Sequence, residues 1–118
     1  MPNEGLRMQS CEERVENSIL MLRPIGVLRG ASSARLRQRL DRALAENTDV
    51  VVDLGSVTAV DSTGLGVMIH ATKTARTHCR SLTFAAPSAR VKAMIERTRL
   101  QSVITLSPSV EAAMERIR

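Results

Sequence analysis

Apolar residues recur every three to four positions in four segments of this chain, and this spacing predicts four amphipathic helices. The helices are expected to begin at Ser32 or Ser33, at residue 64, at Pro87-Ser88 and at Ser107, which would cap a helix with Pro108 in its first turn. Their apolar positions are Leu36, Leu40, Ala43 and Leu44, then Leu65, Met68, Ile69 and Thr72, then Val91, Met94 and Ile95, and finally Val110, Ala113, Met114 and Ile117.

Shorter apolar runs predict five strands between these helices. Residues 8–14 and 18–22 are joined by the polar pair Glu16-Asn17, which indicates an antiparallel hairpin. Residues 48–54 are almost continuously apolar, which indicates a central strand buried on both faces. The remaining two strands are expected at residues 81–85 and 103–106.

A strand pair followed by alternating helices and strands predicts an α/β sandwich with a mixed sheet and helices on at least one face. Residues 1–7 contain Pro2, Asn3 and Gly5 and predict a flexible N-terminus. Residues 8–118 are expected to form a single domain, since a chain of 118 residues buries enough surface for one core.

The net charge of +5 is concentrated in the half of the chain that follows Asp61. Its basic residues alternate with the apolar positions of separate helices, which is typical of a solvated surface. The chain has no Trp or Tyr and a single Phe, Phe84, so it lacks aromatic side chains on which bases could stack. We therefore expect an acidic protein partner and no nucleic acid.

Apolar stretches stay far short of the roughly 20 residues needed to span a membrane, so no direct membrane insertion is expected. The first fifteen residues carry Glu4, Glu12 and Glu13 in place of the apolar centre of a signal peptide, which predicts a cytoplasmic protein.

Few residues offer chemistry of their own. His70 and His78 do not have the spacing of a helical metal pair, and no phosphate-binding glycine loop is present. Cys11 and Cys79 fit neither a zinc pattern nor a redox motif, which leaves two free thiols or a regulatory disulfide between them. We expect a protein that is not an enzyme and needs no cofactor.

The most informative segment runs from Val52 to Gly66, with the sequence VDLGSVTAVDSTGLG. Within it, Asp61-Ser62-Thr63-Gly64 places short polar side chains at the predicted start of a helix. Such a position suits a phosphate, because free N–H groups and the positive end of the helix dipole meet there. Alternatively, Asp61 or Ser62 simply caps the helix.

This segment resembles the signature of the STAS domain, in particular that of the bacterial anti-anti-sigma factors, or anti-sigma factor antagonists. Three further runs agree with the resemblance: APSARV at 86–91, TRLQSV at 98–103 and SPSVEAA at 107–113. The likeness extends from about Leu20 to Arg118. It implies a STAS fold with a mixed four- to five-stranded sheet covered by about four helices.

The resemblance also implies a function. Ser62 would be phosphorylated by an anti-sigma factor serine kinase that supplies the ATP, with Thr63 as the less favoured acceptor, and a phosphatase would reverse the step. Unphosphorylated, the protein would bind and sequester that kinase; the partner-binding residues would be Asp61, Ser62, Thr63, Gly64, Leu65 and Arg29. The alternative is a STAS adaptor that docks constitutively on a transporter ATPase or another regulatory complex.

Three residues depart from the family pattern. Members commonly have G-E-L-D where this chain has Gly26-Val27-Leu28-Arg29, so a valine stands in place of a glutamate and an arginine in place of an aspartate. Arg99 takes a position where the family usually has glycine. The reversed charge of Arg29 is expected to alter the choice of partner.

Overall fold

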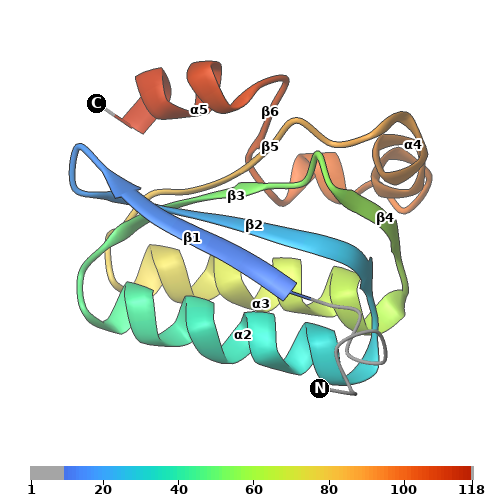
Figure 1. Ribbon diagram of the computed structural model, residues 1–118, viewed down its shortest axis with the longest axis horizontal. Coiled ribbons are helices and arrows are strands. Elements are labelled where there is room, and N and C mark those ends of the chain that lie inside the picture. The colour runs from blue at the N-terminus through green and yellow to red at the C-terminus, as the bar shows by residue number, and fades with distance from the viewer. Residues whose placement is uncertain (1–9, 118) are drawn as a thin grey trace.

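The computed structural model describes residues 10–117, so the expected flexible segment 1–7 and the expected strand start at Met8 lie outside the described part. Figure 1 shows the order of the elements along the chain. The strands are β1 (Ser10–Glu16), β2 (Ile19–Leu28), β3 (Asp49–Asp53), β4 (Val57–Val60), β5 (Leu82–Ala85) and β6 (Leu106–Ser107). The helices are α2 (Gly30–Ala45), α3 (Ser62–Thr77), α4 (Ala89–Arg97) and α5 (Val110–Ile117), with a short 3₁₀ turn at Leu100–Ser102.

The strands form one mixed sheet, in the order β1-β2-β3-β5-β6, with β4 paired to β2. The β1–β2 hairpin is antiparallel, and the other strand pairs described between residues 10 and 117 are parallel. The long strand β2 pairs through Ile19–Leu22 with β3 and, beyond a bulge at Gly26/Val27, through Gly26–Leu28 with β4. In effect β4 continues β3 after a short break, so both follow β2 in the same direction.

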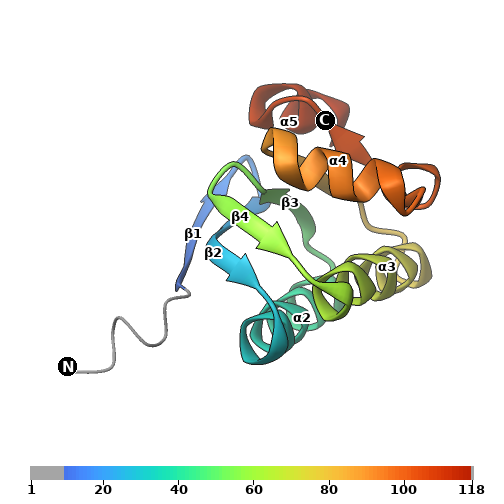
Figure 2. The same cartoon turned by 90° about the vertical axis from the view of Figure 1, so that its right-hand side faces the viewer.

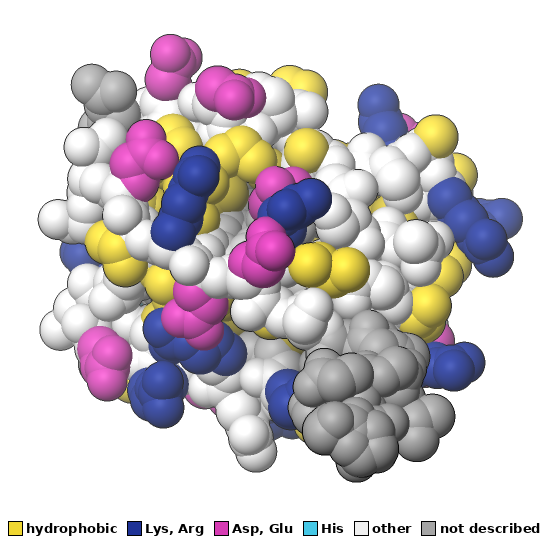
Figure 3. Space-filling view, in the orientation of Figure 1, with side chains coloured by type: hydrophobic (Ala, Val, Ile, Leu, Met, Phe, Trp, Pro, Cys, Tyr) yellow, Lys and Arg dark blue, Asp and Glu magenta, His cyan; other side chains and the backbone are white. Residues whose placement is uncertain are grey.

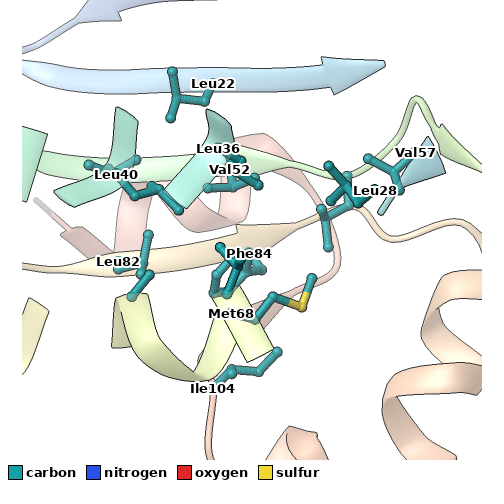
Figure 4. Packing of buried hydrophobic residues seen from close by; sticks show 14 of the residues in the cluster. Leu22, Leu28, Leu36, Leu40, Val52, Val57, Met68, Leu82, Phe84 and Ile104 are labelled. Carbon is teal, nitrogen blue, oxygen red and sulfur yellow. The ribbon is translucent and has the colours of Figure 1, made fainter. Parts of the chain in front are cut away.

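Helices cover both faces of this sheet. α2 and α3 lie side by side on one face, and α5 lies on the other (Figures 1 and 2). The larger core cluster lies between the sheet and α2 and α3, where Leu22, Val52, Met68 and Phe84 are buried (Figure 4). A smaller cluster beneath α5 includes Met21 and Val51. Within the described residues, no helix is long and apolar enough to cross a membrane.

Within residues 10–117, the structure confirms the mixed α/β fold with four helices and the N-terminal hairpin. The sheet formed by these residues has six strands, one more than the sequence predicted. The strand missed was β4, which is only four residues long. It follows the irregular segment Leu54–Ser56, so its residues resemble part of a loop.

Some predicted boundaries were wrong. Ser32 and Ser33 lie inside α2 rather than at its start, and the Ser32 hydroxyl instead accepts a hydrogen bond from the N–H of Arg29 (2.9 Å). Ser107 is a buried strand residue, and the Ser109 hydroxyl accepts a bond from the Ala112 N–H (3.0 Å) at the start of α5. The strand expected at 103–106 is limited to Leu106–Ser107.

Arg99 shows why glycine suits its position. Its φ of 61° and ψ of 25° lie in the left-handed region, and the residue connects the end of α4 to the 3₁₀ turn. A side chain with a Cβ atom is disfavoured there by about 1–2 kcal/mol, whereas glycine enters the region freely.

We therefore predict that Arg99→Gly leaves the free energy of unfolding unchanged or raises it by up to about 1 kcal/mol, because relief of the left-handed conformation offsets the added freedom of the unfolded chain. The matched control is Lys92→Gly at an exposed position within α4, which should lower it by about 1 kcal/mol. Urea denaturation of both variants measures the difference. Equal destabilisation would contradict the explanation.

Candidate functional site

The candidate site forms where β2 and β4 end side by side and lead into α2 and α3 (Figure 2). Leu28 and Val60 are register partners in the parallel pair. The backbone N–H of Asp61 then donates to the carbonyl oxygen of Leu28 (3.1 Å), which extends the strand pairing by one bond. The N-terminal ends of both helices are thereby held next to each other.

Asp61 caps α3. Its backbone is extended, with φ −95° and ψ −173°, and its Oδ1 atom accepts hydrogen bonds from the Gly64 N–H (3.0 Å) and from the Thr63 hydroxyl. The Thr63 hydroxyl is the main cause that lowers the pKa of Asp61, followed by the Gly64 N–H, with a further contribution from the positive charge of Arg29. The carboxylate is therefore a helix cap that holds no proton near neutral pH.

Thr63 and Ser62 have different surroundings although they are sequence neighbours. The Thr63 Oγ1 atom donates to Asp61, accepts from the backbone N–H of Gly30 at the start of α2 (3.2 Å), and lies 3.4 Å from the hydroxyl of Ser33. Thr63 thus connects the two helix ends. Ser62 is exposed as the first residue of α3, and its hydroxyl has no hydrogen-bond partner among residues 10–117.

Gly64 allows the close approach of α3 to the strand ends. A Cβ atom at this buried position would lie 2.5 Å from Val60 Cγ1 and 3.1 Å from the carbonyl oxygen of Leu28. The glycine is therefore required by packing. Leu65 is half-buried and packs on the edge of the main core.

Arg29 is the last residue before α2 and is exposed, directly beside the end of β4. All six residues predicted from the sequence therefore lie at the two paired junctions. The sequence did not indicate the contributions of Gly30, Ser33 and the Leu28 carbonyl. The φ of +51° at Gly30 explains the glycine there, but nothing in the sequence pattern connects these residues to Thr63.

An open groove of about 430 Å³ extends from this site between α2 and α3. Its lining residues are Gly30, Ser33, Ala34, Arg37, Thr63, Gly66, Val67 and His70. His70 is half-exposed and its Nε2 lies 3.1 Å from Asp41 Oδ1. Cys11 and Cys79 are both free and exposed. Across residues 10–117, no group of three or more His, Cys, Asp or Glu side chains could hold a metal ion.

The model of the STAS domain family matches residues 11–113. The chain belongs to the STAS domain family. No curated protein sequence matches it.

Solved structures agree with this assignment. An anti-sigma factor antagonist from Mycobacterium paratuberculosis superposes with a TM-score of 0.84 at 17% identity, covering 100% of this chain and 97% of that one. A proposed antagonist from Thermotoga maritima, TM1081, gives 0.83 at 19% identity, with 92% and 94% covered. The Bacillus cell fate determinant SpoIIAA in its phosphorylated form gives 0.70 at 16% identity, with 93% and 99% covered. At these identities the likeness shows a shared STAS fold.

The geometry predicts different effects for two glycines in α3. Gly64→Ala should lower the free energy of unfolding by about 1–3 kcal/mol, because the new methyl group overlaps Val60 and Leu28. Gly66→Ala should raise it by up to about 1 kcal/mol, because the added Cβ meets nothing within 4 Å and alanine favours the helix. Thermal and urea denaturation of both variants provides the measurement, and a harmless Gly64→Ala would contradict the packing described.

The lowered pKa of Asp61 predicts a pH dependence. A carboxylate whose pKa is lower in the folded than in the unfolded state stabilises the fold above its unfolded pKa of about 3.9, and this contribution is lost as the pH falls through the folded value. Asp61→Asn keeps a capping oxygen but removes the charge. It should be less stable than the wild type at pH 7, and the gap should shrink as the pH falls below about 4. Glu96→Gln, at an exposed position, serves as the control. A stability difference between the wild type and Asp61→Asn that is constant from pH 7 to pH 2 would refute the lowered pKa of Asp61.

Proposed function

We propose that the protein is an anti-sigma factor antagonist that acts as a phosphorylation-switched binding module. In its unmodified form it sequesters a kinase-type anti-sigma factor, and transfer of a phosphoryl group from the kinase's ATP to Ser62 ends that complex. The observation that carries the proposal is the exposed hydroxyl of Ser62, which forms no hydrogen bond with residues 10–117, beside the fully engaged hydroxyl of Thr63. STAS membership and the fold shared with named antagonists support it.

The reaction we propose needs little chemistry from this chain. The Ser62 Oγ would attack the γ-phosphorus of ATP held by the kinase, the bond from that phosphorus to the β-phosphate oxygen would break, and ADP would leave. The serine proton would go to a base of the kinase, because Asp61 has a lowered pKa and is a poor proton acceptor. Asp61 would instead keep the helix start in place.

Phosphorylation at this position is compatible with the fold. The phosphate would occupy the first residue of α3, where the helix dipole and free N–H groups favour negative charge. It would also add about −1.5 to −2 charges and considerable bulk to the surface beside the open groove between α2 and α3. A partner docked on Ser62 and along this groove would lose contact while the domain stayed folded.

The other expectations become part of the same proposal. The chain would be a non-enzymatic cytoplasmic regulator, and a phosphatase would regenerate it. We also propose that it does not bind nucleic acid, since acidic and basic side chains are intermixed on the face seen in Figure 3. The adaptor alternative is not favoured, because the structures that share this fold are named as antagonists.

We predict that Ser62→Ala binds a kinase-type anti-sigma factor constitutively in the presence of ATP. Its free energy of unfolding should be within about 0.5 kcal/mol of the wild type, because the hydroxyl is exposed and forms no hydrogen bond in the described part of the chain. Ser62→Asp should also fold but bind at least about tenfold more weakly, because its charge meets a surface that fits a hydroxyl. Binding is measured by calorimetry with purified kinase.

Ser102→Asp, an exposed serine far from the site along the chain, provides the matched control and should bind like the wild type. Equal affinity of Ser62→Ala and Ser62→Asp for the kinase would reject the proposed switch.

A further inference from the structure

Arg29 is an exposed cation with no partner within the described chain. Its guanidinium makes no hydrogen bond or ion pair with any of residues 10–117, whereas Arg23 and Arg39 pair with Glu12 and Glu13. A free arginine at the edge of a candidate switch site is available to an anion that arrives there.

The fold places this cation beside Ser62. Leu28 and Val60 are partners in neighbouring parallel strands, which lie about 4.8 Å apart. The hydrogen bond from the Asp61 N–H to the Leu28 carbonyl (3.1 Å) keeps the two chain segments at about this distance just beyond the strand ends. Arg29 and Ser62 each follow within two residues of this bond, one at the start of α2 and one at the start of α3.

The charged groups near Ser62 determine which side chain could pair with a phosphate there. Asp61 is its acidic neighbour, and the charge of Arg29 already acts on that carboxylate. The other basic groups along the adjoining groove are partly engaged, because Arg37 and His70 both lie within ion-pair distance of Asp41 (3.8 and 3.1 Å). A phosphate on Ser62 would therefore meet repulsion from Asp61 and attraction from Arg29, a cation that forms no hydrogen bond or ion pair with residues 10–117.

We propose that Arg29 binds the phosphate on Ser62, so that the modified protein carries an internal ion pair across the N-terminal ends of α2 and α3. This inference rests on the proposed phosphorylation of Ser62. Guanidinium and phosphate match in a two-pronged hydrogen-bonded pair, which is stronger than a contact between two point charges. The pair offsets the charge of Asp61 and keeps the phosphate on the surface of its own chain.

The pair has a consequence for partners. In the unmodified protein, Arg29 can form an ion pair with a carboxylate of the docking protein. After modification, Arg29 is paired with the phosphate instead. Phosphorylation thus removes a positive charge from the docking surface in addition to adding bulk. Arg29 is the residue through which an acidic partner surface distinguishes the two forms.

The test needs no kinase, because phosphoserine is incorporated at position 62 of the full chain during its synthesis. The second ionisation of the phosphate, ordinarily near pKa 6, is followed by ³¹P NMR in the wild type, in Arg29→Gln and in Arg29→Lys. We expect the pKa to be about half a unit higher in Arg29→Gln than in the wild type, with Arg29→Lys between them, because Lys keeps the charge but loses the two-pronged geometry. The difference should shrink at high salt.

Arg35→Gln is the matched control, since it also removes one arginine charge, from the N-terminal half of α2, but on the side that faces β1. It should match the wild type. Identical phosphate pKa values in the wild type and Arg29→Gln, or equal shifts in Arg29→Gln and Arg35→Gln, would overturn the pairing. Failure of the switch itself is read separately, from equal affinities of Ser62→Ala and Ser62→Asp for a kinase-type anti-sigma factor.

Discussion

The candidate site depends on one backbone hydrogen bond, from the N–H of Asp61 to the carbonyl oxygen of Leu28. It closes the parallel pairing of β2 with β4 and sets the distance between the two strand-to-helix junctions. Gly64 is required because α3 passes so close to that carbonyl, and Thr63 can reach the start of α2 because the junctions are adjacent. The core beneath holds the sheet and both helices in this arrangement (Figure 4).

Neighbouring residues in the motif have different roles: some stabilise the local structure, and one is exposed to solvent. Asp61 and Thr63 hold the two helix ends together, while Ser62 between them contributes no hydrogen bond within the described chain. Because stability resides in the flanking residues, the proposed modification of Ser62 changes the surface without loosening the fold. The positive end of the α3 dipole and the exposed charge of Arg29 would also stabilise a phosphate at Ser62.

Sequence patterns predicted those elements that have long apolar periodicity, including α2, α3 and the central strand β3. They missed β4, which follows the irregular segment Leu54–Ser56, and they placed the last strand at 103–106, whereas β6 is the two-residue strand Leu106–Ser107. Five candidate site residues, Asp61 to Leu65, were proposed from one short motif, and Arg29 was proposed from the separate run Gly26-Val27-Leu28-Arg29. The pattern could not show which hydroxyl is engaged, because that depends on Gly30 and Ser33, which come from another helix about thirty residues away.

The most direct test of the central claim is to locate the phosphate itself. The full chain is incubated with Mg-ATP and a purified kinase-type anti-sigma factor from the same organism, and the modified residue is identified by fragmentation mass spectrometry. The account predicts a single phosphate on Ser62 and none on Thr63, whose hydroxyl is bonded to Asp61 and Gly30. A phosphate on Thr63 or elsewhere, or no modification by any such kinase of that organism, would contradict it.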